Sequence, residues 1–381
     1  MSVFQGRPRV AHIVPAFFRK DGGIFGGAER YALELAKAMA ERVPTSLFSF
    51  GPAAERQTIG KLDVRIFRTA MHVRSKDGNP LAPGLFPRLL DFDVVHCHQN
   101  HMIYASLSAA LCRLTGRRAF ASDLGGGAWD ISAYISTDRW YQGHLHISQY
   151  SRKLIGRDAD PRHHVIMGGV DTDKFSPDPS ATRGEDVLFV GRLMPHKGVI
   201  DLVDAVDPEM PLTLIGQAYH ERYLADLKHA AEGKRVRFRH ECDDAQLVDA
   251  YRRALVVVLP SVYKDRYGGH GLVPELLGQT LLEGMACGTP AICADVASMP
   301  EVVEDGVTGF IVPPNDPEAL GEKLRWLRAH KDEAARMGEN ARRRVMDLFT
   351  WDRVVERCLT IYNTGTNRAV QASPAPESIA G

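Results

Sequence analysis

The sequence contains no apolar run that approaches the roughly 18 residues a helix needs to cross a bilayer. Its 6 cysteines are scattered, with no C-x-x-C pair and no histidine at a spacing typical of zinc. The first residues do not show the charged and then apolar segments of a secretory signal. These absences argue against an integral membrane protein, a disulfide scaffold and secretion, and they predict a reduced, cytoplasmic protein.

The chain also lacks net charge. Lys and Arg number 47, as do Asp and Glu, so nucleic acid is not an expected partner. The balance conceals an asymmetry, because basic residues outnumber acidic ones before residue 170 and the reverse holds after it. A basic first half suits an anionic acceptor or an anionic lipid surface, but it is equally typical of two halves that attract each other.

Short apolar runs alternate with amphipathic helical stretches along the 381 residues, which predicts parallel sheets covered by helices. A stretch at 177–184 that contains Pro, Asp, Ser and Gly is interpreted as a linker between two such series. We therefore expect two Rossmann-like α/β domains. Ligands bind at the carboxyl ends of parallel strands, so two such domains that face each other predict a shared cleft. A helix is expected at 28–42, and strands are expected at 10–14, 46–50, 93–96, 144–147, 187–190, 212–215, 236–238, 255–259 and 291–293.

Two glycine-bearing loops follow predicted strands. The first ends in Gly26 and Gly27 and opens a helix, whose free amides suit a phosphate or a sugar hydroxyl, although such glycines are equally typical of a turn. It lacks the G-x-G-x-x-G spacing of nicotinamide enzymes. The second begins at Gly191 and carries Arg192 and Lys197, two cations suited to a diphosphate. The alternative for this pair is two solvated surface charges.

The segment 274–290 combines glycine, carboxylates and an apolar run. Gly278 is expected to start a helix whose first amides point at a phosphate. Glu283 falls inside the apolar run, where an unpaired carboxylate is costly, so a partner such as two sugar hydroxyls is expected. Glu275 precedes the helix and can face the same ligand. A buried salt bridge and a capping carboxylate are the alternative interpretation of the two glutamates.

Glu275 and Glu283 are separated by seven residues, and this run resembles the E-x(7)-E signature of the retaining GT-B glycosyltransferases of the large family 4, group 1. Five other segments resemble that family in the same order. They lie around Glu29 and at 93–98, 168–175, 191–198 and 300–310, so the resemblance covers about residues 9–362.

The resemblance implies a GT-B fold and a retaining hexosyltransferase that moves a sugar from a nucleoside diphosphate donor to a hydroxyl acceptor in glycolipid, polysaccharide or other glycoconjugate biosynthesis. Glu283 would hold the ribose, Glu275 the donor sugar, and Arg192 and Lys197 the diphosphate. His98 would line the donor sugar from the first domain. The backbone cradle would comprise Gly26, Gly27, Gly191, Gly278, Gln279, Thr280 and Leu281. No metal cofactor is implied, because the departing phosphate takes the acceptor proton and the cations neutralise its charge.

The implied domains are an acceptor-side domain at 1–172, a donor domain at 173–348, a terminal helix at 349–362 that returns to the first domain, and a disordered tail at 363–381. The alternative for the helix is ordinary packing on the second domain. The loop at 262–274 is longer than is usual in the family, and we expect it either to shape the donor pocket or to act as a lid.

Several alternatives stay open. His98, with His96 and His101 nearby, is also consistent with core packing or with a metal site. The D-x-D strings at 91–93, 158–160 and 171–173 are consistent with a metal ion that binds the diphosphate. A sugar-nucleotide epimerase and a non-catalytic carbohydrate-binding protein are the rival functions. The donor base is open between uridine and guanosine. The acceptor is either a soluble glycan or a lipid-linked one at the inner membrane face, which the basic stretch weakly favours. Its members are Arg56, Lys61, Arg65, Arg68, Arg74 and Lys76.

Overall fold

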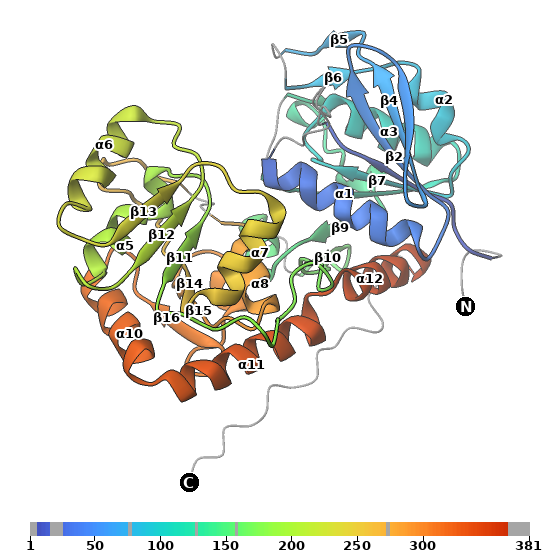
Figure 1. Ribbon diagram of the computed structural model, residues 1–381. Coiled ribbons are helices and arrows are strands. Elements are labelled where there is room, and N and C mark those ends of the chain that lie inside the picture. Colours follow the sequence, from blue (N-terminus) through green and yellow to red (C-terminus); the bar gives the residue numbers. More distant parts are fainter. Residues whose placement is uncertain are drawn as a thin grey trace. The chain divides into compact units, whose positions relative to one another are not determined.

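The structure, a computed structural model, describes residues 6–15, 26–74, 78–125, 129–156, 159–271 and 275–364. The chain divides into two compact units (Figure 1). Unit 1 comprises residues 1–146, 155–166 and 355–381, and unit 2 comprises 147–154 and 167–354. The division therefore falls after residue 166, where the sequence predicts it after 172.

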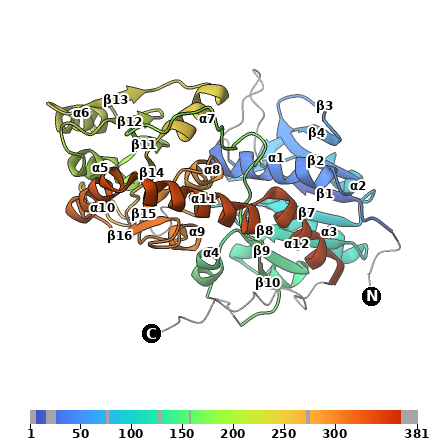
Figure 2. The same cartoon turned by 60° about the horizontal axis from the view of Figure 1, so that its bottom comes forward.

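Unit 1 is built on a sheet whose described strands lie in the order β10-β9-β8-β7-β1-β2-β4-β3. Neighbouring strands pair in parallel except β3 and β4, which are antiparallel. Figure 2 shows β7, β8 and β9 side by side. The strands are β1 (Val10–Ile13), β2 (Thr45–Gly51), β3 (Glu55–Ile59), β4 (Leu62–Arg68), β7 (Val94–His98), β8 (Arg118–Ser122), β9 (Gly143–His146) and β10 (His163–Val165), with a separate pair β5 (Met71–His72) and β6 (Pro80–Leu81). The helices are α1 (Gly26–Ala40), α2 (Leu85–Leu89) and α3 (Ile103–Leu114), with two short 3₁₀ turns at Ile131–Ala133 and Asp138–Trp140.

The central strands of unit 1 are buried on both faces. Every residue of β1, β2 and β7 is buried, as expected for parallel strands between helices. Side chains alternate between two apolar clusters, so that Leu47 packs with Leu33 and Ala36 while its neighbour Phe48 packs with Val95. This explains why the short apolar runs of the sequence predict these strands well.

Unit 2 contains a parallel sheet whose described strands lie in the order β13-β12-β11-β14-β15-β16. Helix α5 contacts α6 and α10, whereas α8 contacts α7 and α11. The strands are β11 (Val187–Val190), β12 (Leu212–Ile215), β13 (Val236–Arg239), β14 (Val256–Leu259), β15 (Ala291–Ala294) and β16 (Gly309–Val312). The helices are α4 (Gln149–Leu154), α5 (Val199–Ala205), α6 (Glu221–Ala230), α7 (Asp244–Arg253), α8 (Gln279–Ala286), α9 (Met299–Val302), α10 (Pro317–Ala329) and α11 (Lys331–Leu348), with a 3₁₀ turn at Pro195–Lys197.

The last helix, α12 (Trp351–Thr364), contributes its residues from 355 onward to unit 1. Within that unit the hydroxyl of Tyr362 lies 2.7 Å from Nδ1 of His96, and Arg118 donates to the carbonyl of Tyr362 at 2.7 Å. The end of the helix is thus tied to β7 and β8.

The two parallel sheets confirm the predicted fold class. Each predicted strand is present within two residues of its expected bounds, and β11 and β12 coincide with the prediction. The helix expected at 28–42 begins two residues earlier, at Gly26. Strands β3, β4, β5, β6, β8, β10 and β16 were not predicted.

Candidate functional site

The carboxyl edge of the unit 2 sheet gathers most of the residues singled out in the sequence. Strand β14 pairs in parallel with both β11 and β15, so the loops that follow these three strands emerge side by side. They are the loop 191–198, the segment that starts at Pro260, and the turn 295–298. The topology therefore brings together loops that are about a hundred positions apart in the chain.

Lys197 and Glu275 meet at this edge in a direct ion pair between Nζ and Oε1. Both side chains are largely buried, with 12% and 13% of their surface exposed. The hydroxyl of Ser261, which is fully buried, donates to the same oxygen of Glu275 at 3.2 Å. A charged pair held in a partly desolvated place interacts more strongly than one on the surface, and hydrogen bonds to the carboxylate help to fix its orientation.

The loop 191–198 presents its two cations differently. Lys197 closes the 3₁₀ turn and is held toward Glu275, whereas Arg192 is exposed and makes no ion pair with a described residue. Gly198 adopts φ +64°, and a Cβ there would lie 2.0 Å from the carbonyl oxygen of Pro260. Only glycine fits this contact between the loop and the segment after β14. Burial, followed by the charge of Lys197, lowers the pKa of His196.

Helix α8 begins where the sequence predicts it to. Gly278 precedes the helix with φ +79°, ψ +53°, a left-handed conformation that favours glycine. Gln279 and Thr280 occupy the first helical positions, whose amides have no acceptor within the helix. The amide of Leu281 differs, because it donates to the carbonyl of Gly278 at 3.0 Å and its side chain is fully buried. Its amide is thus already engaged in the helix itself.

Glu283 lies one turn further along α8 and is 4% exposed. Its Oε2 accepts a hydrogen bond of 2.9 Å from the hydroxyl of Tyr251 on α7. The sequence predicts a partner for this buried carboxylate but does not single out Tyr251. Ser261 was missed in the same way, although a polar residue directly after the apolar run of β14 is a usable signal.

His98 belongs to a group of three buried imidazoles in unit 1. His12, His96 and His98 are each 0% exposed, and their ligand-forming nitrogens lie within 4.8 Å of one another. Nδ1 of His12 lies 3.0 Å from Nε2 of His98. Burial lowers the pKa of His12 to about 3 and holds those of His96 and His98 well below 6.5. All three rings are therefore neutral at pH 7.

These imidazoles could in principle hold a metal ion, since neutral ring nitrogens are metal ligands. Both ring nitrogens of His96, however, already face hydroxyls, Nε2 that of Ser122 at 2.8 Å and Nδ1 that of Tyr362 at 2.7 Å. A two-sided hydrogen-bonded ring has no lone pair left for a cation. The arrangement fits a buried hydrogen-bond network better than a metal centre, and His101 does not join it.

The other first-domain residues are placed as follows. Gly26 and Gly27 form the first turn of α1, and a Cβ on Gly27 would meet nothing within 4 Å, so its backbone is open to approach. Residues 16–25, which include two further glycines of this loop, Gly22 and Gly23, lie outside the described residues.

The D-x-D strings take part in local contacts. Asp93 accepts the amide of Arg9 at 2.8 Å, Asp160 pairs with Arg162, and Asp171 accepts the amides of Asp173 and Lys174. Asp158 lies outside the described residues.

Three members of the basic stretch form ion pairs within unit 1. Arg56 and Arg65 both pair with Asp63, and Lys61 pairs with Glu41. The guanidinium of Arg74 stacks on another residue of the unit, Trp129, at 4.3 Å, and Lys76 lies outside the described residues. A charge count from the sequence treats the paired side chains as free cations. It therefore overstates the attraction of this stretch for an anionic surface.

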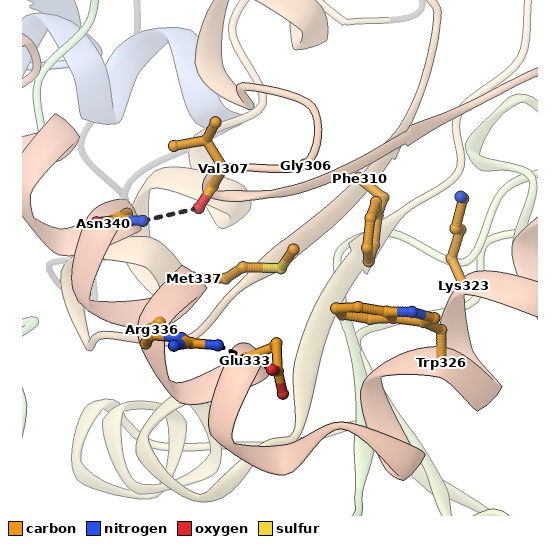
Figure 3. Close-up of a pocket in the computed structure, with 9 residues that line it drawn as sticks. All are labelled: Gly306, Val307, Phe310, Lys323, Trp326, Glu333, Arg336, Met337 and Asn340. Carbon is orange, nitrogen blue, oxygen red and sulfur yellow. Dashed lines mark hydrogen bonds and ion pairs between the residues drawn. The ribbon is translucent and has the colours of Figure 1, made fainter.

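A pocket of about 500 Å³ lies elsewhere in unit 2, between β16 and the helices α10 and α11. Figure 3 shows its apolar wall, where the ring of Phe310 stands edge-on to Trp326 with 5.2 Å between centroids and Met337 lies beside them. Arg336 and Glu333 form an ion pair at its rim. None of the predicted site residues lines this pocket.

Comparisons with known proteins identify the family of the chain. Residues 170–344 match the family model "Glycosyl transferases group 1", and residues 25–174 match "Glycosyltransferase Family 4". Alpha-maltose-1-phosphate synthase of Mycobacterium tuberculosis is 32% identical over 313 residues, which cover 71% of this chain and 78% of that protein. Phosphatidyl-myo-inositol mannosyltransferase of Mycobacterium leprae is 27% identical over 395 residues, which cover 93% and 96%.

Solved structures match over nearly the whole length. HepE of Anabaena, in complex with UDP and glucose, superposes with a TM-score of 0.69 at 18% identity, covering 93% of this chain and 99% of that one. A sucrose-phosphate synthase of Thermosynechococcus elongatus gives 0.68 at 20%, covering 93% and 98%. The fold and the matched families together define a nucleotide-sugar-dependent glycosyltransferase of the GT-B fold. The chain belongs to glycosyltransferase family 4, group 1.

A helix must be both long and apolar to cross a bilayer. Among the helices in the described part of the chain, none meets both requirements.

Proposed function

We propose that the carboxyl edge of the unit 2 sheet binds the donor and that the enzyme transfers a hexosyl group with retention of anomeric configuration. The observation that carries this proposal is the buried Lys197–Glu275 pair beside the start of α8. In this proposal the diphosphate takes over Lys197 as its counterion, and Glu275 is released to accept hydrogen bonds from the sugar hydroxyls. Glu283 accepts those of the ribose.

Charge on the leaving diphosphate grows as the glycosidic bond breaks. Lys197, the exposed Arg192 and the amides of Gln279 and Thr280 stabilise that charge. Gly191 and Gly278, both with positive φ, allow close approach of the backbone to the donor. The departing phosphate takes the proton of the acceptor hydroxyl. For His98, complete burial favours the packing alternative over contact with the sugar.

For the donor we propose a uridine diphosphate hexose. HepE of Anabaena has been solved with UDP-glucose, which supports uridine as the base, and the relatives' names include glycosyl- and mannosyltransferases, which supports a hexose. A comparison of UDP and GDP binding tests this proposal. Tighter binding of GDP would indicate a guanosine diphosphate donor instead.

For the acceptor we propose a hydroxyl of a glycan or glycolipid. The name of the Mycobacterium leprae relative specifies a phosphatidylinositol acceptor, which supports a lipid-linked molecule at the inner membrane face. Asp63 and Glu41 offset part of the charge of Arg56, Lys61 and Arg65, which weakens the attraction to anionic lipid and supports a soluble acceptor. Cosedimentation with phosphatidylglycerol vesicles distinguishes these two, because a lipid acceptor requires binding and a soluble one does not.

Transfer kinetics test the proposed roles of the two cations. Arg192→Ala and Lys197→Ala should each lower kcat by about 10- to 1,000-fold, because their charge matters most when the diphosphate departs, while the donor KM changes less. The exposed Arg222→Ala on α6 serves as a matched control. A loss that falls entirely on the donor KM would contradict the proposed role. Release of an epimerised nucleotide-sugar without an acceptor would favour the epimerase instead.

A further inference from the structure

The segment 260–267, which follows β14, contacts both partners of the Lys197–Glu275 pair. Its first residues touch the turn that carries the lysine. The amide of Val262 donates to the carbonyl of His196 at 2.9 Å, and the carbonyl of Pro260 fills the space that a side chain at Gly198 would need. The backbone of this segment thus fixes one side of the cationic loop.

The same segment reaches the carboxylate through a side chain. Ser261, between the two backbone contacts, donates its hydroxyl to Glu275 at 3.2 Å. Residues 260–262 therefore contact both the turn that carries Lys197 and the carboxylate of Glu275. A shift of this segment relative to α5 would change the separation of the two charged groups.

The far end of the segment is fixed by Arg266, which pairs with two carboxylates of α5. Its Nε and Nη2 lie 2.8 and 2.6 Å from the same oxygen of Asp201, and Nη2 also lies 2.5 Å from Asp204. The side chain of Asp201 is 7% exposed, so this ion pair is shielded from solvent on the aspartate side. Helix α5 begins directly after Lys197 and Gly198, which makes it the continuation of the cationic loop.

Local contacts give the segment a fixed shape around Arg266. Asp265 accepts the amides of Tyr267 and Gly269, at 2.8 and 2.9 Å, and the hydroxyl of Tyr267 donates to Asp226 on α6 at 2.5 Å. The described part of the loop is therefore anchored to α5 and α6.

We propose that Arg266 is a positioning residue for the transfer reaction. By clamping α5 to the segment 260–267, it keeps Lys197 at the distance from Glu275 and Ser261 that the donor diphosphate and sugar require. The inference rests on the proposed function of this site, and Arg266 itself does not touch the donor. It acts through Asp201 and Asp204, whose helix carries the lysine on its preceding turn.

The test compares Arg266→Gln with Arg266→Lys in donor and acceptor kinetics. A misplacement of about 1 Å lowers rates by about 100-fold, so Arg266→Gln should lower kcat by about 10- to 100-fold with little change in donor KM. Lysine can pair with one aspartate but cannot fork across both, so Arg266→Lys should recover part of that loss. Tyr267→Phe, which removes only the tie to Asp226, is the matched control and should stay close to wild type.

Removing Arg266 also leaves Asp201 as a buried, unpaired carboxylate, which can destabilise unit 2. The double variant Arg266→Gln/Asp201→Asn removes both charges and separates the two effects. The proposal predicts a recovered unfolding temperature with kcat still low. It is overturned if the double variant, or a well-folded Arg266→Gln, has wild-type kcat, or if Tyr267→Phe loses as much as Arg266→Gln. Absence of transfer by the wild-type enzyme with every donor would instead count against the proposed function.

Discussion

At the scale of single residues, the site rests on Glu275 and the groups that hold it. Its carboxylate receives the ammonium of Lys197 and the hydroxyl of Ser261, and its backbone carbonyl receives the hydroxyl of Ser298 at 3.5 Å. The sequence predicted Glu275, Lys197 and Glu283 as site residues because charged residues in glycine-bounded or apolar segments are chemically conspicuous. It did not predict Ser261 or Tyr251, because a lone hydroxyl acquires a role only through contacts that form between distant parts of the chain.

Ser261→Ala tests the smallest of these contacts. Loss of a hydrogen bond to a charged group costs about 1.5–3 kcal/mol, so kcat/KM for the donor should fall by about tenfold or more. Ser298→Ala is the control, since its hydroxyl is at the limit of hydrogen-bond distance and contacts only the backbone of Glu275. Equal rates for the Ser261 variant and wild type would show that the carboxylate does not depend on this hydroxyl.

At the scale of elements, the start of α8 is the most informative case. The sequence predicted the helix to begin at Gly278, and it does, because glycine alone among the nearby residues adopts φ +79° without strain. Strand β3 shows the opposite case. Its sequence ERQTI is polar and four of its five residues are exposed, so it carries no apolar signal. Its pairing with β4 is antiparallel at the edge of the sheet and depends on neighbouring backbone rather than on local pattern.

Gly278→Ala should weaken the nucleotide site by moving the first amides of α8. A non-glycine residue in the left-handed region costs about 1–2 kcal/mol, and the new Cβ would lie 3.1 Å from Leu281. Gly233→Ala is a matched control, because Gly233 has φ +74° with nothing within 4 Å of a Cβ. Urea unfolding should show a similar loss of stability in both variants. Calorimetric titration should show weaker binding of UDP in the Gly278 variant alone.

The buried histidines of β1 and β7 make unit 1 sensitive to acid. Burial lowers the pKa of His12 to about 3 and those of His96 and His98 well below 6.5. Below pH 6.5 the unfolded chain therefore binds protons that the folded unit does not. The free energy of unfolding is highest above this pH and should fall on acidification by about 1.4 kcal/mol per pH unit for each histidine.

Urea unfolding at a series of pH values between 7.5 and 5 measures this slope. His12→Phe should make the slope shallower, because one of the buried titrating groups is removed. His229→Gln, at an exposed position, is the control and should leave the slope as in wild type. A slope that is the same in His12→Phe and wild type would contradict the assignment of acid sensitivity to these rings.

At the scale of the whole molecule, two parallel-sheet domains follow from the alternation of apolar runs and amphipathic stretches. The places where the chain changes units do not follow from it. Residues 147–154 belong to unit 2 because Glu301 accepts the amides of Gln149 and Tyr150, at 2.7 and 2.6 Å, at the start of α4. The end of α12 belongs to unit 1 because Tyr362 reaches His96. Both ties join residues more than 150 positions apart, and no local pattern encodes them.

The central claim is that a nucleoside diphosphate binds beside α8 with its ribose on Glu283. Thermal unfolding with millimolar UDP, GDP, ADP and dTDP, in wild type and in Glu283→Gln, tests it most directly. A ligand at about 100 times its Kd adds about 2.7 kcal/mol, which corresponds to about 5–10 °C for a domain of this size. We predict that UDP raises the unfolding temperature of wild type by this amount and that Glu283→Gln loses most of the shift. No shift with any nucleotide, or an equal shift in the variant, would contradict the account.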